Sequence, residues 1–220
     1  DKAVMKVLFN ARRLPTVQYR VVLEADWARD AAGILRAVRR EFRVPFERFV
    51  LCAAIIADRK NQMGLIRALR GTGIPVVFVG DVAPGQEGYH RQCCRESDPS
   101  SVLFLPRLPQ SKLTGAYRAA HLHALPSWIE TPGLASLEAG LLGCNLVLTE
   151  QETVQEYFQD KADYCRPRNL ISIRNALSRA WNSPRNHRRV DAFIRERYTW
   201  GRAALETRSA YCLLLGRSDS

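Results

Sequence analysis

The chain has 220 residues, of which 46% are hydrophobic and 25% are charged, and 33 Lys and Arg against 22 Asp and Glu give a formal net charge of +11. This composition excludes a disordered or collagen-like chain, and no apolar run approaches the roughly 18 residues that a membrane span needs. The positive charge favours an anionic partner, such as a phosphorylated ligand, nucleic acid or an acidic membrane surface, without choosing among them.

Short runs of β-branched and aliphatic residues alternate with amphipathic stretches of helical length along most of the chain. The first strand and helix are predicted over Tyr19–Leu23 and Asp26–Phe42, with Asp26 as the helix N-cap. Further strands are predicted over the ranges Phe49–Ala54, Ile74–Val79, Ser101–Leu105, Leu122–Leu125 and Leu146–Thr149. Helices are predicted between these strands, over the ranges Asn61–Arg70, Gln86–Arg95, Ser111–Ala119 and Gly133–Leu142.

After Asn169 only helices are predicted, over the ranges Leu170–Trp181, Asn186–Arg197 and Thr199–Leu215. The runs Val76–Val79 and Leu146–Leu148 are apolar throughout, which is typical of strands covered on both faces. The sequence therefore predicts an α/β fold with a doubly wound, Rossmann-like parallel sheet and a helical C-terminal tail. We expect residues 1–18 to form a poorly defined N-terminal segment and residues 19–220 to form one domain. Ligands of such sheets bind beyond the carboxyl ends of the strands.

The six cysteines never take the C-x-x-C spacing of a zinc or redox site. His121 and His123 could share one face of a strand, but no third ligand is near in sequence, and structural histidines are the more common explanation of such a pair. We therefore expect free thiols, no metal, and a reducing, cytosolic compartment.

The segment after Leu125 reads P-S-W-I-E-T-P-G-L-A-S-L-E-A-G and carries the most chemical information. It enters a helix, and the free backbone N–H groups at Gly133 and Leu134 favour a phosphate. Glu130 precedes this helix and Glu138 lies within it, and each carboxylate could accept from two neighbouring hydroxyls of a sugar. On spacing alone, two ordinary surface glutamates explain the pattern equally well.

A basic pair, Arg59 and Lys60, follows the predicted strand Phe49–Ala54. At this edge of the sheet, a fixed cation can offset the charge of a diphosphate. An ordinary basic surface loop explains the pair equally well.

Together with further motifs, these residues resemble the C-terminal, donor-binding half of retaining GT-B glycosyltransferases of the group 1 type. The resemblance covers about residues 45–215 in order, and it includes the E-x7-E pattern from Glu130 to Glu138. The other motifs are R-K-N-Q at 59–62, F-V-G-D at 78–81, F-L-P-R-L at 104–108, Y-R-A-A at 117–120, L-P-S at 125–127, G-C-N at 143–145, E-Y-F at 156–158 and Y-T-W at 198–200.

The resemblance implies a role for each candidate residue. Glu138 would hold the ribose hydroxyls of the nucleotide, Glu130 would contact the transferred sugar, and Lys60 would bind the diphosphate. The remaining candidates for binding the donor are Gly133 and Leu134 at the phosphates, Arg107 beside the base, Arg59 and Thr131. The donor would be a nucleotide-diphosphate sugar, used as a substrate without a metal or other cofactor.

Two departures from the family pattern shape the functional hypothesis. The family normally carries a Gly-Arg pair at the end of the strand that here reads C-A-A-I over residues 52–55, and that arginine is missing. Arg59 could substitute for it. The acceptor-binding N-terminal half also has no counterpart in residues 1–44. We therefore expect a domain that binds the donor and presents it for retaining transfer, inactive in isolation, with a catalytically inactive binding or scaffolding module as the alternative.

The expected acceptor is a glycan or lipid-linked molecule held by the missing domain, in polysaccharide biosynthesis in the cytoplasm. Peripheral association with the inner face of the membrane and the oligomeric state stay open. No nucleic-acid partner is expected, because the sequence has neither a recognition-helix motif nor an aromatic stacking platform. A dinucleotide-dependent dehydrogenase is disfavoured, because no G-x-G-x-x-G follows the first strands.

Overall fold

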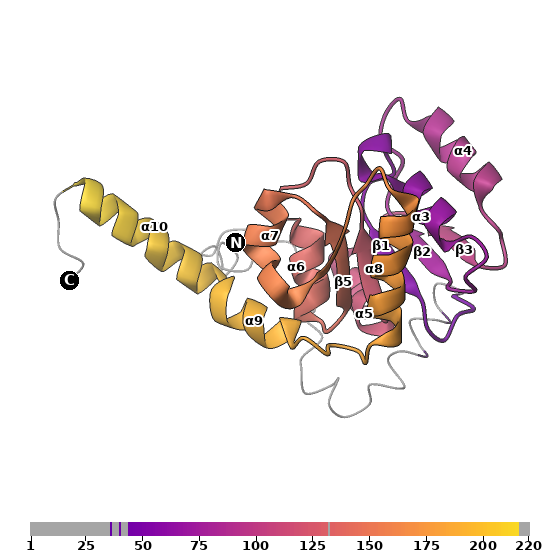
Figure 1. Cartoon of the computed structure of the whole chain (residues 1–220). Helices are drawn as coiled ribbons and strands as arrows, with labels where there is room; N and C mark the ends of the chain where they lie inside the picture. The colour runs from indigo at the N-terminus through magenta and orange to yellow at the C-terminus, as the bar shows by residue number, and fades with distance from the viewer. Residues whose placement is uncertain (1–35, 37–39, 41–43, 132, 216–220) are drawn as a thin grey trace. The chain divides into compact units, whose positions relative to one another are not determined.

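The computed structural model describes residues 36, 40, 44–131 and 133–215 (Figure 1). Residues 22–191 belong to one compact unit and residues 192–220 to a second. The predicted segment 1–18 and the strand Tyr19–Leu23 lie outside the described residues. So does the helix Asp26–Phe42, apart from two described residues that are helical, Arg36 and Arg40.

The first unit is built around a six-stranded sheet with the order β3-β2-β1-β4-β5-β6. Every neighbouring pair of these strands is parallel, which confirms the predicted doubly wound, Rossmann-like α/β class. The strands are β1 (Val50–Ala53), β2 (Val76–Val79), β3 (Val102–Leu105), β4 (Leu122–Leu125), β5 (Asn145–Thr149) and β6 (Asp163–Cys165). In the register of the two central pairs, Val50 lies beside Val76 of β2 and Leu122 of β4.

Helices follow each strand and cover both faces of the sheet (Figure 1). They are α3 (Gln62–Leu69), α4 (Glu87–Glu96), α5 (Gln110–Ala119), α6 (Leu134–Leu141), α7 (Glu152–Phe158) and α8 (Leu170–Asn182), with short 3-10 turns η1 (Asp58–Lys60) and η2 (Gln159–Lys161). Helix α3 packs against α8, and α5 packs against α6. Every residue of β1, β2, β4 and β5 is buried, and the continuous apolar runs predict this for β2 and β5.

The chain ends in helices α9 (Val190–Arg197) and α10 (Trp200–Leu214), which confirm the predicted helical tail. Two elements of the first unit have no sequence prediction. Strand β6 has only three residues, too few for a recognisable pattern, and α7 buries only Val154 and Phe158, so its apolar periodicity is weak.

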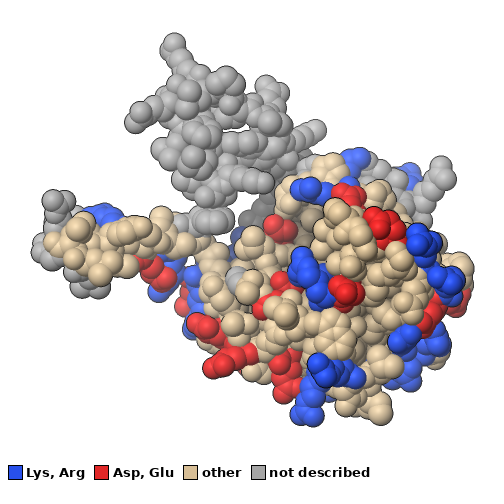
Figure 2. Space-filling view, turned by 90° about the horizontal axis from the view of Figure 1, so that it is seen from above, with Lys and Arg blue, Asp and Glu red and all other residues tan. Residues whose placement is uncertain are grey.

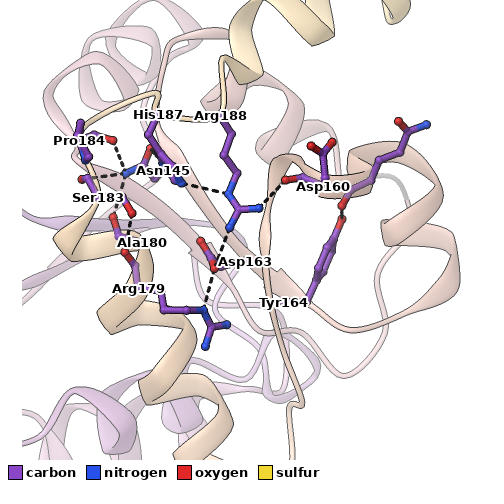
Figure 3. Close-up of polar contacts among 11 residues, drawn as sticks. Asn145, Asp160, Asp163, Tyr164, Arg179, Ala180, Ser183, Pro184, His187 and Arg188 are labelled. Atoms are coloured by element: carbon purple, nitrogen blue, oxygen red, sulfur yellow. Dashed lines mark hydrogen bonds and ion pairs between the residues drawn. The ribbon is translucent and has the colours of Figure 1, made fainter.

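A polar network fastens the loop after α8 to the amino-terminal edge of the sheet (Figure 3). Asn145, the first residue of β5, donates through Nδ2 to the carbonyl oxygen of Pro184 at 3.1 Å. Asp163, the first residue of β6, accepts on Oδ1 from Arg179 at 3.0 Å and from Arg188 at 3.2 Å. The side chains of Asn145 and Asp163 therefore find their hydrogen-bond partners within the protein, and this edge of the sheet has a structural role.

Gly80 allows the chain to pass close to β1 where β2 ends. A Cβ atom on Gly80 would lie 2.0 Å from the carbonyl oxygen of Ala54. We therefore expect Gly80→Ala to lower the free energy of unfolding by about 1–3 kcal/mol in urea denaturation, because the backbone has to move apart. Gly88→Ala is the matched control, since its nearest neighbour is an Arg91 side-chain nitrogen at 4.0 Å, and it should stabilise α4 by about 0.5–1 kcal/mol. Equal changes in the two variants would contradict this account.

Candidate functional site

The order of the strands places a candidate site between β1 and β4. Strands β2 and β3 continue the sheet on one side of this pair, and β5 and β6 continue it on the other. At such a reversal the loops that leave the two central strands turn to opposite faces, and a crevice opens between them beyond the carboxyl ends of the strands. The loops after β1 and β4 therefore flank the site, and both carry sequence-predicted residues.

Lys60 and Glu130 meet across this crevice. Lys60 ends the turn η1 after β1, and its Nζ donates to Oε2 of Glu130, in the loop after β4, at 2.5 Å. Their side chains are 11% and 13% exposed. The same Glu130 oxygen accepts from Oγ of Ser127 at 3.0 Å. The fold thus joins the two predicted catalytic residues in a largely buried ion pair.

The loop that carries Glu130 is fixed by its neighbours on both sides. The backbone N–H of Trp128 donates to the carbonyl oxygen of Arg59 at 2.9 Å. From the loop after β5, Gln151 accepts from the N–H of Glu130 at 3.0 Å and donates to the carbonyl oxygen of Trp128. Thr153 donates to the carbonyl oxygen of Glu130 at 3.2 Å. These contacts position Glu130 through its backbone and leave its carboxylate for Lys60 and Ser127.

Asn61 ties three of the loops at this edge together. It adopts the left-handed conformation, with φ of 56°, and its side chain accepts from the N–H of Gly64 to cap α3. Its Nδ2 donates to the carbonyl oxygens of Pro126 and Pro167, both at 3.0 Å. The sequence prediction starts α3 at Asn61 but gives it no such role. The usable signal is that asparagine both tolerates this conformation and caps helices.

The start of α6 follows the loop that carries Glu130 and has backbone N–H donors without helical partners. Gly133, the N-cap, has φ of 59° and ψ of 74°, a conformation that glycine adopts without strain. Its carbonyl oxygen already accepts from the N–H of Ser136 at 2.8 Å. The N–H of Gly133, which the sequence assigns to a phosphate together with that of Leu134, donates to the carbonyl oxygen of Thr131 in this structure. The N–H groups of Leu134 and Ala135 have no partner within the helix, so they are the donors available to an anion.

Glu138 lies inside α6 and is partly exposed. Within the part of the chain that the structure describes, its carboxylate forms no hydrogen bond or ion pair. Burial raises the pKa of the Tyr117 hydroxyl, and the negative charge of Glu138 raises it further, which places the two side chains near each other. The carboxylate is therefore available to a ligand.

The other predicted residues are exposed and less closely associated with the ion pair. Arg59 and Thr131 lie in the two loops that flank the crevice, and the N–H of Gly133 donates to the carbonyl oxygen of Thr131. Arg107 follows β3, two strands away from β1, and its N–H donates to Asp81 Oδ1 at 3.1 Å. The fold thus gathers the predicted residues along one sheet edge, and Lys60 and Glu130 are the pair of them that it joins through charged side chains in the described part of the chain.

No three His, Cys, Asp or Glu side chains in the described ranges gather closely enough to hold a metal ion. All six cysteines are free. Burial raises the pKa of Cys52, in β1, to about 12, so this thiol stays protonated. No described helix has the length and apolarity to cross a membrane. On the face shown in Figure 2, Lys and Arg lie scattered among Asp and Glu rather than forming one continuous basic patch.

Comparison with known proteins identifies the family. Residues 38–197 match the family model of glycosyl transferases group 1. The chain belongs to this family. None of the curated proteins matches the chain.

Solved structures with the same fold agree with this assignment. The chain is similar to a sucrose-phosphate synthase from Thermosynechococcus elongatus (17% identity, TM-score 0.69) and to HepE from Anabaena in complex with UDP and glucose (20%, 0.68). Each alignment covers 83% of this chain, but only 49% and 52% of those chains, about half of their length. It also matches the C-terminal domain of a group 1 family protein, LpcC, from Francisella tularensis (15%, 0.65), covering 74% of this chain and 92% of that domain. The fold is therefore that of a GT-B C-terminal domain.

Proposed function

We propose that this chain binds a nucleotide-diphosphate sugar and presents it for glycosyl transfer to an acceptor held by another domain. The observation that carries the proposal is the Lys60–Glu130 pair beside the free amides of α6, at the point where the strand order reverses. The ligands named for HepE, which are UDP with glucose and UDP-glucose, support this class of donor.

Each group has a chemical task in this proposal. Lys60 and the amides of Leu134 and Ala135 provide positive charge for the diphosphate, whose charge grows as its bond to the sugar breaks. Glu130 accepts from hydroxyls of the transferred sugar, and Glu138 accepts from the ribose hydroxyls. In the free protein Glu130 neutralises Lys60, so donor binding exchanges one anionic partner of Lys60 for another. Retention of the anomeric configuration is part of the proposal, and it rests on the resemblance of the sequence to retaining glycosyltransferases.

The remaining predicted residues are assigned further contacts with the donor. Arg59 and Thr131 supply further contacts from the two flanking loops, and Arg107 lies beside the base. No metal or cofactor takes part. Within the predicted domain of residues 19–220, the unit of residues 22–191 carries every assigned binding residue and binds the donor. We place this function in the cytoplasm, in polysaccharide biosynthesis with a glycan or lipid-linked acceptor, and without nucleic acid as a partner.

Calorimetric titration of the 220-residue chain with UDP, GDP, ADP and their sugar conjugates tests the proposal. We expect one nucleoside diphosphate to bind, and Glu138→Ala to weaken its binding by about tenfold through the loss of charge-assisted hydrogen bonds to the ribose. Because Glu138 makes no hydrogen bond or ion pair with the residues that the structure describes, the free energy of unfolding should stay within about 0.5 kcal/mol. Glu152→Ala, a change at an exposed glutamate of α7, is the control and should leave binding unaltered.

The alternative is a transferase-like module without activity. It is favoured by Ile55, which is 38% exposed at the strand end where the resemblance leads us to expect an arginine. If the folded chain binds none of the nucleotides of the panel, the donor-binding proposal is wrong and this alternative is left.

A further inference from the structure

A buried polar cluster lies beneath the first turn of α6, outside the groups assigned above. His123, in β4, has no exposed surface, and its Nε2 lies 3.2 Å from Oγ of Ser136, itself buried in the first turn of α6. The other ring nitrogen, Nδ1, has no partner among the described residues. An imidazole buried in this way costs free energy relative to an apolar side chain of similar size. What histidine adds at this position is the bond to Ser136.

Ser136 connects this bond to the predicted phosphate-binding backbone. Its N–H donates to the carbonyl oxygen of Gly133 at 2.8 Å, and its Oγ would lie only 3.3 Å from a Cβ atom on Gly133. Ser136 therefore contacts the N-cap through both its backbone and its side chain. The His123 bond links this turn to β4, and so holds the amides of Leu134 and Ala135 in place relative to the sheet.

The ring of His123 is held in one charge state and one orientation. Burial, with a smaller contribution from the positive charge of Lys60, lowers its pKa to about 4, so the imidazole is neutral near pH 7. The ring of Tyr117, fully buried in α5, packs edge-on against it with centroids 5.9 Å apart.

We propose that His123 is a positioning residue, which acts through Ser136 to aim the amides at the start of α6 toward the diphosphate of the donor. This inference rests on the proposed function and deepens it. Its distinctive consequence is selectivity: losing the contact weakens recognition of the diphosphate and leaves recognition of the nucleoside unchanged. A purely structural role would weaken both equally or lower only the stability.

The test compares four variants of the whole chain by calorimetry. The probes are the nucleoside diphosphate of the panel that binds the unmodified chain most tightly and the nucleoside without phosphates. His123→Phe keeps the ring volume without the hydrogen bond, Ser136→Ala removes the other partner, and the double variant removes both. His123→Gln is the conservative replacement, because its amide reaches about as far as Nε2. Thr149→Val, in β5, is the control, since Thr149 is fully buried and its hydroxyl is unpartnered among the described residues.

We expect His123→Phe and Ser136→Ala each to weaken diphosphate binding by about fivefold, with no further loss in the double variant, as one lost neutral hydrogen bond predicts. Nucleoside binding should stay constant, and His123→Gln should restore most of the diphosphate affinity. If His123→Phe does not fold, Ser136→Ala decides the question alone. Unchanged diphosphate binding, an equal loss for the nucleoside, or additive effects overturn the inference while the proposed function stands. If the unmodified chain binds none of the nucleotides, both fail.

Discussion

Replacing Lys60 by methionine is expected to weaken the binding of a nucleoside diphosphate by about fiftyfold. Methionine keeps much of the length of the side chain but removes the charge that lies between the loops after β1 and β4. A charge-assisted hydrogen bond to a largely desolvated anion contributes about 1.5–3 kcal/mol, and the free energy of a fiftyfold change in affinity lies within this range. Calorimetric titration with the diphosphate of the panel that binds most tightly measures the effect.

The same change should also lower the stability, for a reason that can be separated from binding. Without Lys60, the hydroxyl of Ser127 is the one partner that the described residues leave to the Glu130 carboxylate, whose side chain is 13% exposed. An incompletely paired charge at this depth is expected to lower the free energy of unfolding by about 1–3 kcal/mol. Adding Glu130→Gln removes that charge, so the double variant should regain most of the stability while its diphosphate binding stays weak.

Lys161→Met is the matched control for the loss of a lysine charge. Lys161 pairs with Asp160 at 3.1 Å, but the Asp160 side chain is 74% exposed, so the pair contributes less than about 1 kcal/mol. Binding of the diphosphate should not change. A similar loss of binding in Lys161→Met would mean that net charge, rather than the position of Lys60, determines affinity. Binding that returns in the Lys60→Met and Glu130→Gln double variant would show that the single change acted only through stability.

The sequence predicts the framework of this site because apolar periodicity is a local property. The continuous runs of β2 and β5 identify strands covered on both faces, and a parallel sheet follows from the helices between them. Since all parallel strands end at one edge, the prediction also places Lys60 and Glu130 at the same edge. For the predicted elements that the structure describes, the bounds differ by only a few residues from those observed.

The contacts within the site cannot be obtained in the same way. Sequence spacing does not show that Lys60 pairs with Glu130, because that depends on the directions of two side chains in different loops. Gln151 follows β5 and has no motif of its own, yet it fixes the Glu130 backbone. His123 fits the sequence as an ordinary core histidine, and the tertiary structure brings the hydroxyl of Ser136, in α6, against its ring. The pattern thus locates the site, and tertiary packing determines its chemistry.

His123 should also make the folded chain lose stability in acid. Its pKa is lowered to about 4 by burial, against about 6.5 in an unfolded chain. Between these values the unfolded chain binds a proton that the folded chain does not, so the free energy of unfolding falls as the pH falls from 6.5 toward 4. The loss reaches about 3 kcal/mol once the pH is below both values.

Urea denaturation at several pH values between 7 and 4 measures this loss when the unmodified chain is compared with His123→Phe. The phenylalanine variant lacks the titrating group, so its stability relative to the unmodified chain should rise steadily as the pH falls. Carboxylates such as Glu96, whose pKa is lowered to about 2 by Arg67, titrate in both chains and cancel in the difference. Parallel profiles would mean that the folded chain admits a proton to His123. The imidazole would then become charged beneath α6 as the pH falls below about 6.5, and burial would not be what keeps it neutral in its contact with Ser136.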